Sequence, residues 1–159
     1  MLEPGSFILP QGSAPKIRAL FDYWQSIHPE SGLPGRQHLD PLDIPSLLPS
    51  IWMIDVTRDP LRFRFRLVGT EIVNFVGRDV TGLWLDEFFE GYEDNESFHT
   101  HRNCALTGVP GYRKGSVLFS PRQAELEAER LYLPLAQDGK EVDILLVMTL
   151  YVGEPPRRR

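Results

Sequence analysis

The sequence predicts an α+β domain in which an antiparallel sheet carries short helices. Residues 51–57 and 61–68 read as two strands joined by a turn at 58–60, and the second strand alternates apolar residues with arginines, the period-2 pattern of a strand with one buried face. Short helical patterns follow over 70–89, and strand-like segments return in the last third of the chain. We expect this arrangement, with a large apolar surface between its parts, to enclose something small.

The first 50 residues divide into two predicted segments. Residues 1–14 contain prolines and glycines with little periodicity, which predicts a disordered tail. Residues 15–50 are predicted to form a helix and a Pro-rich ordered loop, with Pro15 at the first helical position and Asp40 capping a turn that begins at Pro41. The helix carries one apolar stripe, formed by Ile17, Leu20, Phe21, Trp24 and Ile27.

Residues 51–153 form the predicted core. After the first two strands we expect a short helix over 71–76 that Gly77 ends, and two shorter turns near 78–82 and 85–89. These turns are too short to be stable alone, so they need a sheet to lie on.

A longer helix is predicted to begin with the acidic residues at 93–96 and to end at Gly108. One side of this helix carries Phe98, Arg102, Ala105 and Leu106. Strands are then expected over 112–119 and 141–152, with the final hairpin turning at Asp138-Gly139.

Residues 122–135 are harder to assign because their alternation of polar and apolar residues changes phase near Arg130. An unbroken flat strand cannot keep both sets of side chains on their correct faces. Two alternatives stay open, a β-bulge near Arg130 or a helical turn over 122–130, and we favour the bulge. The chain closes with a predicted basic tail, residues 154–159.

The composition excludes several classes of protein. The 159 residues carry a net charge of -5, which argues against a nucleic-acid-binding domain. No apolar run approaches the roughly 20 residues that span a bilayer, no signal peptide is visible, and the single cysteine excludes an intrachain disulfide. We therefore expect a cytoplasmic protein with no nucleic acid and no membrane among its partners.

Several motifs follow one another along the chain: Tyr23-Trp24, Leu33-Pro34, 40–45, Leu48-Pro49, Ile51-Trp52, 63–70, 77–82 and 131–135. In these motifs and in its order of elements, the chain resembles a PAS-like family of proteobacterial proteins over about residues 16–152. The resemblance implies a PAS fold, with a five-stranded antiparallel sheet in the spatial order 2-1-5-4-3, helices on one face and an N-terminal amphipathic helix. It also implies a stand-alone PAS domain that binds a small molecule or dimerises, and we expect its output to pass through an unidentified signalling protein.

A ligand cavity is expected between the sheet and the helices. Its predicted binding residues are Phe65, Leu67, Ile72, Phe75, Trp84, Phe88, Phe98 and Met148. Phe63 and Phe89 belong to the same set of apolar side chains. The alternative is that these side chains fill a solid core, and the identity of any cofactor stays open.

The apolar stripe of the N-terminal helix must be buried against another surface, because an exposed patch of large apolar residues is energetically unfavourable. In PAS proteins such a helix often packs across the open sheet face or against its mate in a homodimer. We predict a homodimer whose interface contains Ile17, Leu20, Phe21 and Trp24. The alternative is that the helix packs on its own sheet.

Three residues of the longer helix are candidates for cofactor chemistry. His99 and His101 lie where some haem-binding PAS domains carry an axial histidine, although two exposed histidines are the simpler interpretation. Residues two apart on a helix cannot share one metal ion, so no metal site is predicted. The Asn103-Cys104 pair resembles the cysteine motif of flavin-binding light sensors, but the residues that follow it differ, so we expect a buried, inert thiol.

Arg62, Arg64 and Arg66 form a basic row on what the resemblance makes an edge strand, where charge discourages unwanted pairing. An anion or a partner protein could contact this row. No nucleophile, phosphate-loop or metal-ligand motif is visible, so no enzyme is predicted.

The sequence therefore predicts a sensory module that binds a small apolar or amphipathic molecule and signals through protein contacts. Ligand binding would favour one packing of the helices against the sheet. The first alternative is a ligand-free dimerisation or interaction module, and the second is a haem-based sensor that uses His99 or His101.

Overall fold

A computed structural model describes residues 7–116 and 127–152 of the chain. Its centre is an antiparallel sheet of five strands: β1 (Ile51–Thr57), β2 (Arg62–Val68), β3 (Gly111–Ser116), β4 (Glu127–Leu135) and β5 (Ile144–Tyr151). The strands lie in the order β2-β1-β5-β4-β3, which confirms the predicted order and makes β2 an edge strand.

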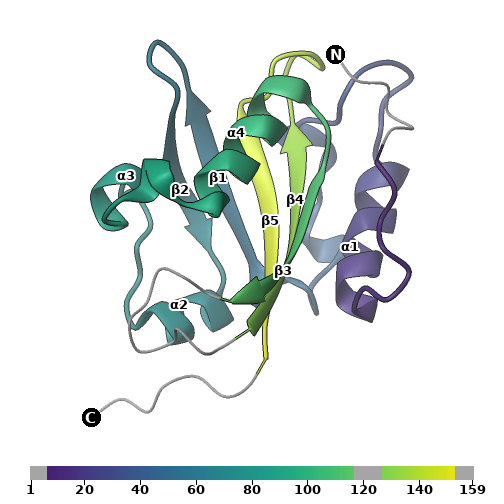
Figure 1. The fold of residues 1–159 in the computed structure, drawn as a ribbon. Helices are drawn as coiled ribbons and strands as arrows, with labels where there is room; N and C mark the ends of the chain where they lie inside the picture. The colour runs from purple at the N-terminus through teal and green to yellow at the C-terminus, as the bar shows by residue number, and fades with distance from the viewer. Residues whose placement is uncertain (1–6, 117–126, 153–159) are drawn as a thin grey trace.

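Helices lie on both sides of this sheet (Figure 1). One face is covered by α2 (Thr70–Val76), α3 (Leu85–Phe88) and α4 (Glu96–Thr107), and the other by α1 (Pro15–Ser26). Short 3-10 turns complete the described chain at Arg36–His38, Pro41–Asp43, Leu48–Ser50 and Tyr92–Asp94. The predicted cap at Asp40 is confirmed, because its carboxylate accepts a hydrogen bond from the Leu42 backbone N–H at 3.0 Å.

Helix α1 forms where its apolar stripe predicts it, and it packs on its own sheet. Trp24 Nε1 donates a hydrogen bond to the Pro134 carbonyl oxygen of β4 at 3.0 Å. The stripe is buried against side chains of β4 and β5. The residues predicted for the dimer interface therefore lie in the core of the protomer: Ile17, Leu20, Phe21 and Trp24.

The two faces of the sheet carry separate hydrophobic cores. Along β5, Leu146 and Met148 pack with α1, whereas Leu145 and Val147 pack on the side of α4, because successive side chains of a strand point to opposite faces. Met148 was expected in the cavity between sheet and helices, but it lies on the other side of the sheet.

A β-bulge near the end of β2 changes the side to which Leu67 points. Ile54 pairs with Phe65 and Met53 pairs with Leu67, so Arg66 is the extra residue. Phe65 packs in the core beneath α4, whereas Leu67 shares the face of Met53 and remains 44% exposed. Leu67 therefore lies away from the expected cavity, because the alternation of β2 does not continue through the bulge.

Strand β4 is regular through Arg130, and its pairing with β3 and β5 shows no shift of register. The predicted bulge there is wrong, and so is a helical turn at Arg130 itself; residues 122–126 lie outside the described residues. The change of phase arises because both faces of β4 are buried. Glu129 points to the α1 side, where it accepts hydrogen bonds from Ala14 N and the Tyr112 hydroxyl.

Of the four residues expected on one side of α4, Phe98 and Ala105 pack in the core and the other two do not. His101, Cys104 and Ala105 are buried, whereas Arg102 and Leu106 are exposed. The helix has few large apolar residues, so its pattern did not determine its rotation. His101, which we expected to be exposed, is therefore a core residue.

Two residues of the N-terminal segment pack on the domain. Phe7 lies against Phe21, with 5.6 Å between ring centroids, and Leu9 is buried. Residues 1–6 of the predicted disordered tail and the predicted basic tail at 154–159 lie outside the described residues.

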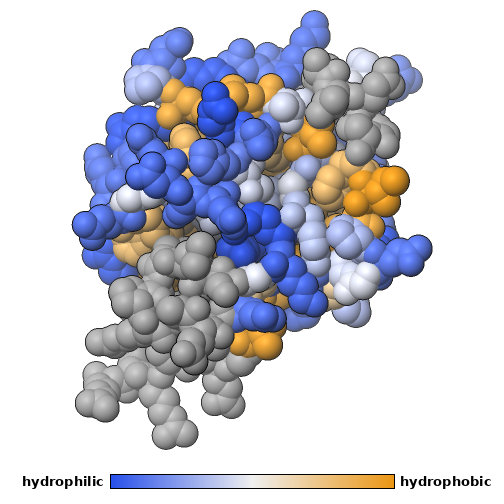
Figure 2. Space-filling model, in the orientation of Figure 1, coloured by the Kyte–Doolittle hydropathy of each residue, from blue (hydrophilic) through white to orange (hydrophobic). Residues whose placement is uncertain are grey.

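On the face drawn in Figure 2, hydrophobic residues form separate groups among hydrophilic ones. Within 7–116 and 127–152, no helix combines the length and the apolar character needed to cross a bilayer.

Candidate functional site

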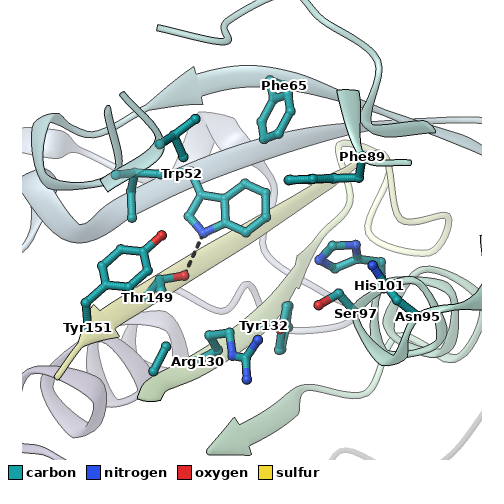
Figure 3. Close-up of a pocket in the computed structure, with 13 residues that line it drawn as sticks. Trp52, Phe65, Phe89, Asn95, Ser97, His101, Arg130, Tyr132, Thr149 and Tyr151 are labelled. Carbon is teal, nitrogen blue, oxygen red and sulfur yellow. Dashed lines mark hydrogen bonds between the residues drawn. The ribbon is translucent and has the colours of Figure 1, made fainter. Parts of the chain in front are cut away.

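A small pocket lies between the sheet and the helical side that contains α2 and α4 (Figure 3). Its volume is about 30 Å³, room for a few atoms, since one water needs about 10–15 Å³. The apolar part of its wall comprises Trp52, Phe65, Ile72, Val76, Phe89 and Ala128. The polar part comprises Asn95, Ser97, His101, Arg130, Tyr132, Thr149 and Tyr151.

Contacts between neighbouring strands, and between a strand and α2, stabilise the wall of the pocket. Trp52 of β1 donates a hydrogen bond from Nε1 to Thr149 Oγ1 of β5 at 2.9 Å, and its ring lies 5.6 Å from that of Phe65. Tyr151 stacks on Phe75 of α2 with 3.8 Å between ring centroids. These contacts join β1, β5 and α2 around one space.

Two of the predicted ligand-binding residues, Phe65 and Ile72, line this pocket, and so does Phe89. Phe75 and Phe88 belong to the same core but are not part of the wall. The same holds for Phe98. Whether any of these residues binds a ligand stays a prediction.

Trp84 lies elsewhere, on the outer side of β2. The Arg62 guanidinium lies 4.0 Å from the centroid of its ring, and Trp84 lines a surface groove together with Arg64. Leu67 lines a further groove beside Met53. The structure therefore does not bring these residues together with Phe65 and Ile72.

His101 projects from α4 into the pocket and is 1% exposed. Its Nδ1 atom is hydrogen-bonded to the Tyr92 hydroxyl, and its Nε2 atom has no partner among the described residues. Burial, together with the positive charges of Arg113 and Arg130, lowers the pKa of His101 to about 3. The imidazole is therefore neutral at neutral pH.

Arg130 is 3% exposed, and its Nε and Nη2 atoms have no hydrogen-bond partner among the described residues. It lies opposite Arg113 in the pairing of β3 with β4. Arg113 is neutralised by Glu96 at 2.8 Å. Burial lowers the pKa of Arg130, but a guanidinium stays charged in proteins, so the pocket wall carries a positive charge.

The residues present do not fit a haem group. His101 Nε2 is aimed into the pocket, but a cavity of about 30 Å³ is far smaller than a porphyrin ring. His99 is exposed on α4. Among the described residues, no group of three His, Cys, Asp or Glu side chains could hold a metal ion.

The Cys104 thiol is buried, as predicted, and it is not part of the pocket wall. Burial raises its pKa, which keeps it in the unreactive protonated form. Its sulfur lies 3.9 Å from the Tyr132 carbonyl oxygen.

The basic row of β2 is largely neutralised. Arg62 donates two hydrogen bonds of 2.8 Å to the carboxylate of Asp86, and this contact lowers the pKa of Asp86. Arg66 pairs with Asp55 at 3.1 Å. The free edge of β2 is also partly paired, since Phe65 N donates to the carbonyl oxygen of Leu83 at 2.9 Å.

Sequence reasoning missed all of the polar wall and part of the apolar wall. The lining residues that it did not predict for the pocket are Trp52, Val76, Asn95, Ser97, His101, Ala128, Arg130, Tyr132, Thr149 and Tyr151. One signal was present: the polar and apolar pattern changes phase at Arg130. An arginine within a strand whose two faces are both apolar must be buried, and a buried cation needs a partner.

A family model described as PAS domain matches residues 13–149 of the chain. A search of curated proteins finds no match. Among solved structures, the chain is similar to a LOV protein of Rhodobacter sphaeroides, with a TM-score of 0.51 and 11% identity, covering 86% of this chain and 68% of that one. At this identity the likeness concerns the fold alone.

Proposed function

Since this chain belongs to the PAS domain family, we propose that it is a sensory module that binds a small molecule in the pocket beneath α4 and signals through protein contacts. The observation that carries the proposal is a small, mainly apolar space in which three buried polar atoms have no partner among the described residues, namely His101 Nε2, Arg130 Nε and Arg130 Nη2. Buried polar groups are normally hydrogen-bonded. Such atoms are suited to hold and orient a ligand.

The proposed mechanism is a shift between packings of the helices on the sheet. Ile72 and Val76 of α2 and Phe89 after α3 form part of the pocket wall. Helices of seven and four residues, the lengths of α2 and α3, are not stable alone. A ligand that contacts their side chains will favour one arrangement of them, and a partner protein can recognise that arrangement.

We extend the proposal to a cytoplasmic protein without catalytic activity. The support comes from the sequence, which has a single cysteine and none of the common catalytic motifs. A ligand-free interaction module is the second candidate, and the small volume of the pocket, about 30 Å³, favours it.

Mass spectrometry separates these two candidates. We expect the native mass of the purified protein to exceed the denatured mass by one small molecule, or the melting temperature to rise by several degrees with at least one member of a metabolite panel. An unchanged mass together with an unchanged melting temperature would favour the interaction module and contradict sensing.

A pocket-filling variant identifies where the ligand lies. Ala128 lines the pocket and is fully buried, so Ala128→Val should fill much of the space and abolish the mass difference or the thermal shift. Ala105→Val is the matched control, because Ala105 is also buried but is not part of the wall. Retained binding in Ala128→Val would show that the ligand lies elsewhere.

A further inference from the structure

Arg130, the cation in the pocket wall, has no carboxylate partner among the described residues, whereas its neighbour Arg113 has one. Arg113 and Arg130 lie opposite each other on β3 and β4, where like charges destabilise the pair. Glu96 neutralises Arg113. The charge of Glu96 also acts to raise the pKa of Arg130, but among the described residues no carboxylate forms an ion pair with Arg130. Glu129 cannot serve Arg130 in the same way, because it points to the other face of the sheet and binds Ala14 and Tyr112 there.

Among the described residues that line the pocket, none has an acidic side chain. Arg130 presents Nε and Nη2, both unpartnered among the described residues. These two atoms form one edge of the planar guanidinium, the edge that can bind both oxygens of a carboxylate. A buried guanidinium that no carboxylate contacts is costly, so the site favours an anion.

The histidine adds a further donor rather than an acceptor. Tyr92 is 3% exposed, and burial raises its pKa, so its hydroxyl keeps its proton and must donate it. Its hydroxyl partner in the described structure is His101 Nδ1. Because Nδ1 accepts, the proton of the neutral imidazole lies on Nε2, and Nε2–H is directed into the pocket.

The beginning of α4 adds positive potential at the same place. Asn95 caps this helix of 12 residues by accepting a hydrogen bond from Phe98 N at 3.0 Å, and both Asn95 and Ser97 line the pocket. The N-terminal end of a helix carries a partial positive charge. Figure 3 shows Asn95, Ser97, His101 and Arg130 around the same space.

We propose that the pocket binds a small carboxylate, with both of its oxygens on the Nε and Nη2 atoms of Arg130 and with His101 Nε2–H as a further donor. A short apolar tail then contacts Trp52, Ile72 and Phe89. This inference rests on the proposed function, whose ligand it assigns to a chemical class.

The volume of the pocket and the composition of its wall restrict the chemical class of the ligand further. A space of about 30 Å³ corresponds to about two or three water molecules, so it accommodates a chain of about two or three carbons at most. The apolar part of the wall disfavours phosphate and sulfate, because oxygens turned toward Trp52, Ile72 or Phe89 would be desolvated without donors. Short monocarboxylates satisfy both conditions.

Calorimetric titration of the full chain with sodium propionate tests the assignment. We expect saturable binding of propionate, with propionamide, sodium phosphate and sodium hexanoate each at least tenfold weaker. Equal binding of propionate and propionamide would overturn the requirement for charge, and tighter binding of phosphate would overturn the carboxylate. Absence of propionate binding would also overturn it.

Two variants of equal charge change separate a binding role of Arg130 from a structural one. Arg130→Met should weaken propionate binding about 100-fold, the loss of two charge-assisted hydrogen bonds, while the melting temperature of the free protein stays equal or rises. Arg102→Met removes a charge from the exposed side of α4 and should change propionate binding less than threefold. A lower melting temperature of the free Arg130→Met protein would overturn the proposal, since it would show that Arg130 already has a partner.

The experiments distinguish a failure of the carboxylate assignment from a failure of the proposed sensory function. If mass spectrometry reveals a neutral bound compound while propionate does not bind, the carboxylate is refuted and the sensory function stands. If no compound is bound and no member of the panel raises the melting temperature, both are refuted.

Discussion

Burial of His101 couples the protonation of one side chain to the stability of the whole domain. The groups around it are Arg113 and Arg130, which stay positive, and Tyr92 and Tyr132, whose pKa values burial raises. None of these four changes its charge between pH 3 and pH 7. These four neighbours therefore keep a constant charge over that range.

We predict that the free energy of unfolding falls as the pH is lowered from 7 to 4. The pKa of His101 is about 3 in the folded protein and about 6.5 when unfolded, so the unfolded chain binds a proton that the folded chain does not. The contribution of neutral His101 to the free energy of unfolding is fully present above pH 6.5 and is lost toward pH 3. At pH 4 the loss is on the order of 3 kcal/mol.

Urea unfolding of the wild type and of His101→Gln at a series of pH values measures this effect. Other carboxyl groups titrate in both proteins, so the difference between them isolates His101. The difference should shrink steadily below pH 6.5. A difference that is constant with pH would contradict the buried, neutral state of His101.

At the scale of elements, α1 and the bulge in β2 decide which side chains are available to the pocket. Helix α1 covers one face of the sheet completely enough that Met148 becomes a core residue beneath it. The bulge at Arg66 turns Leu67 to that same side of the sheet. The pocket is consequently restricted to side chains from the α4 face.

We predict that Trp24→Ala destabilises the protein by about 3–5 kcal/mol, the usual range for removing a large buried aromatic side chain. The variant also leaves the Pro134 carbonyl oxygen without the hydrogen bond from Trp24 Nε1. Chemical denaturation measures the change. Leu42→Ala is the control, since Leu42 is 85% exposed and its loss should cost less than about 0.5 kcal/mol.

At the scale of the whole molecule, the homodimer stays a prediction. The four residues expected at its interface are occupied within the protomer, so a dimer must use other surfaces. We predict that the wild type sediments as a dimer and that Phe21→Leu, a conservative change in the core beneath α1, lowers the melting temperature without dissociating it.

Sedimentation velocity over a range of protein concentrations provides the measurement. A monomeric wild type would refute the homodimer. A dimeric wild type that dissociates in Phe21→Leu, while the variant remains folded, would instead show that α1 exchanges its intramolecular contacts for intermolecular ones.

The sequence by itself determined the order of the elements and most of their limits. The apolar stripe from Ile17 to Trp24, the cap at Asp40 and the left-handed glycine at Gly77, with φ of +93°, each act over a few neighbouring residues. Such local signals can be read directly from the chain. They predicted α1, the turn at Pro41–Asp43 and the end of α2.

Only the tertiary structure decided which side chains meet in the pocket. Arg130, Thr149 and Trp52 come from three different strands and become neighbours through strand pairing, which periodicity along a single strand cannot report. The rotation of α4 and the bulge at Arg66 likewise depend on packing against distant residues. For that reason, the polar side of the pocket followed from the fold and not from any motif.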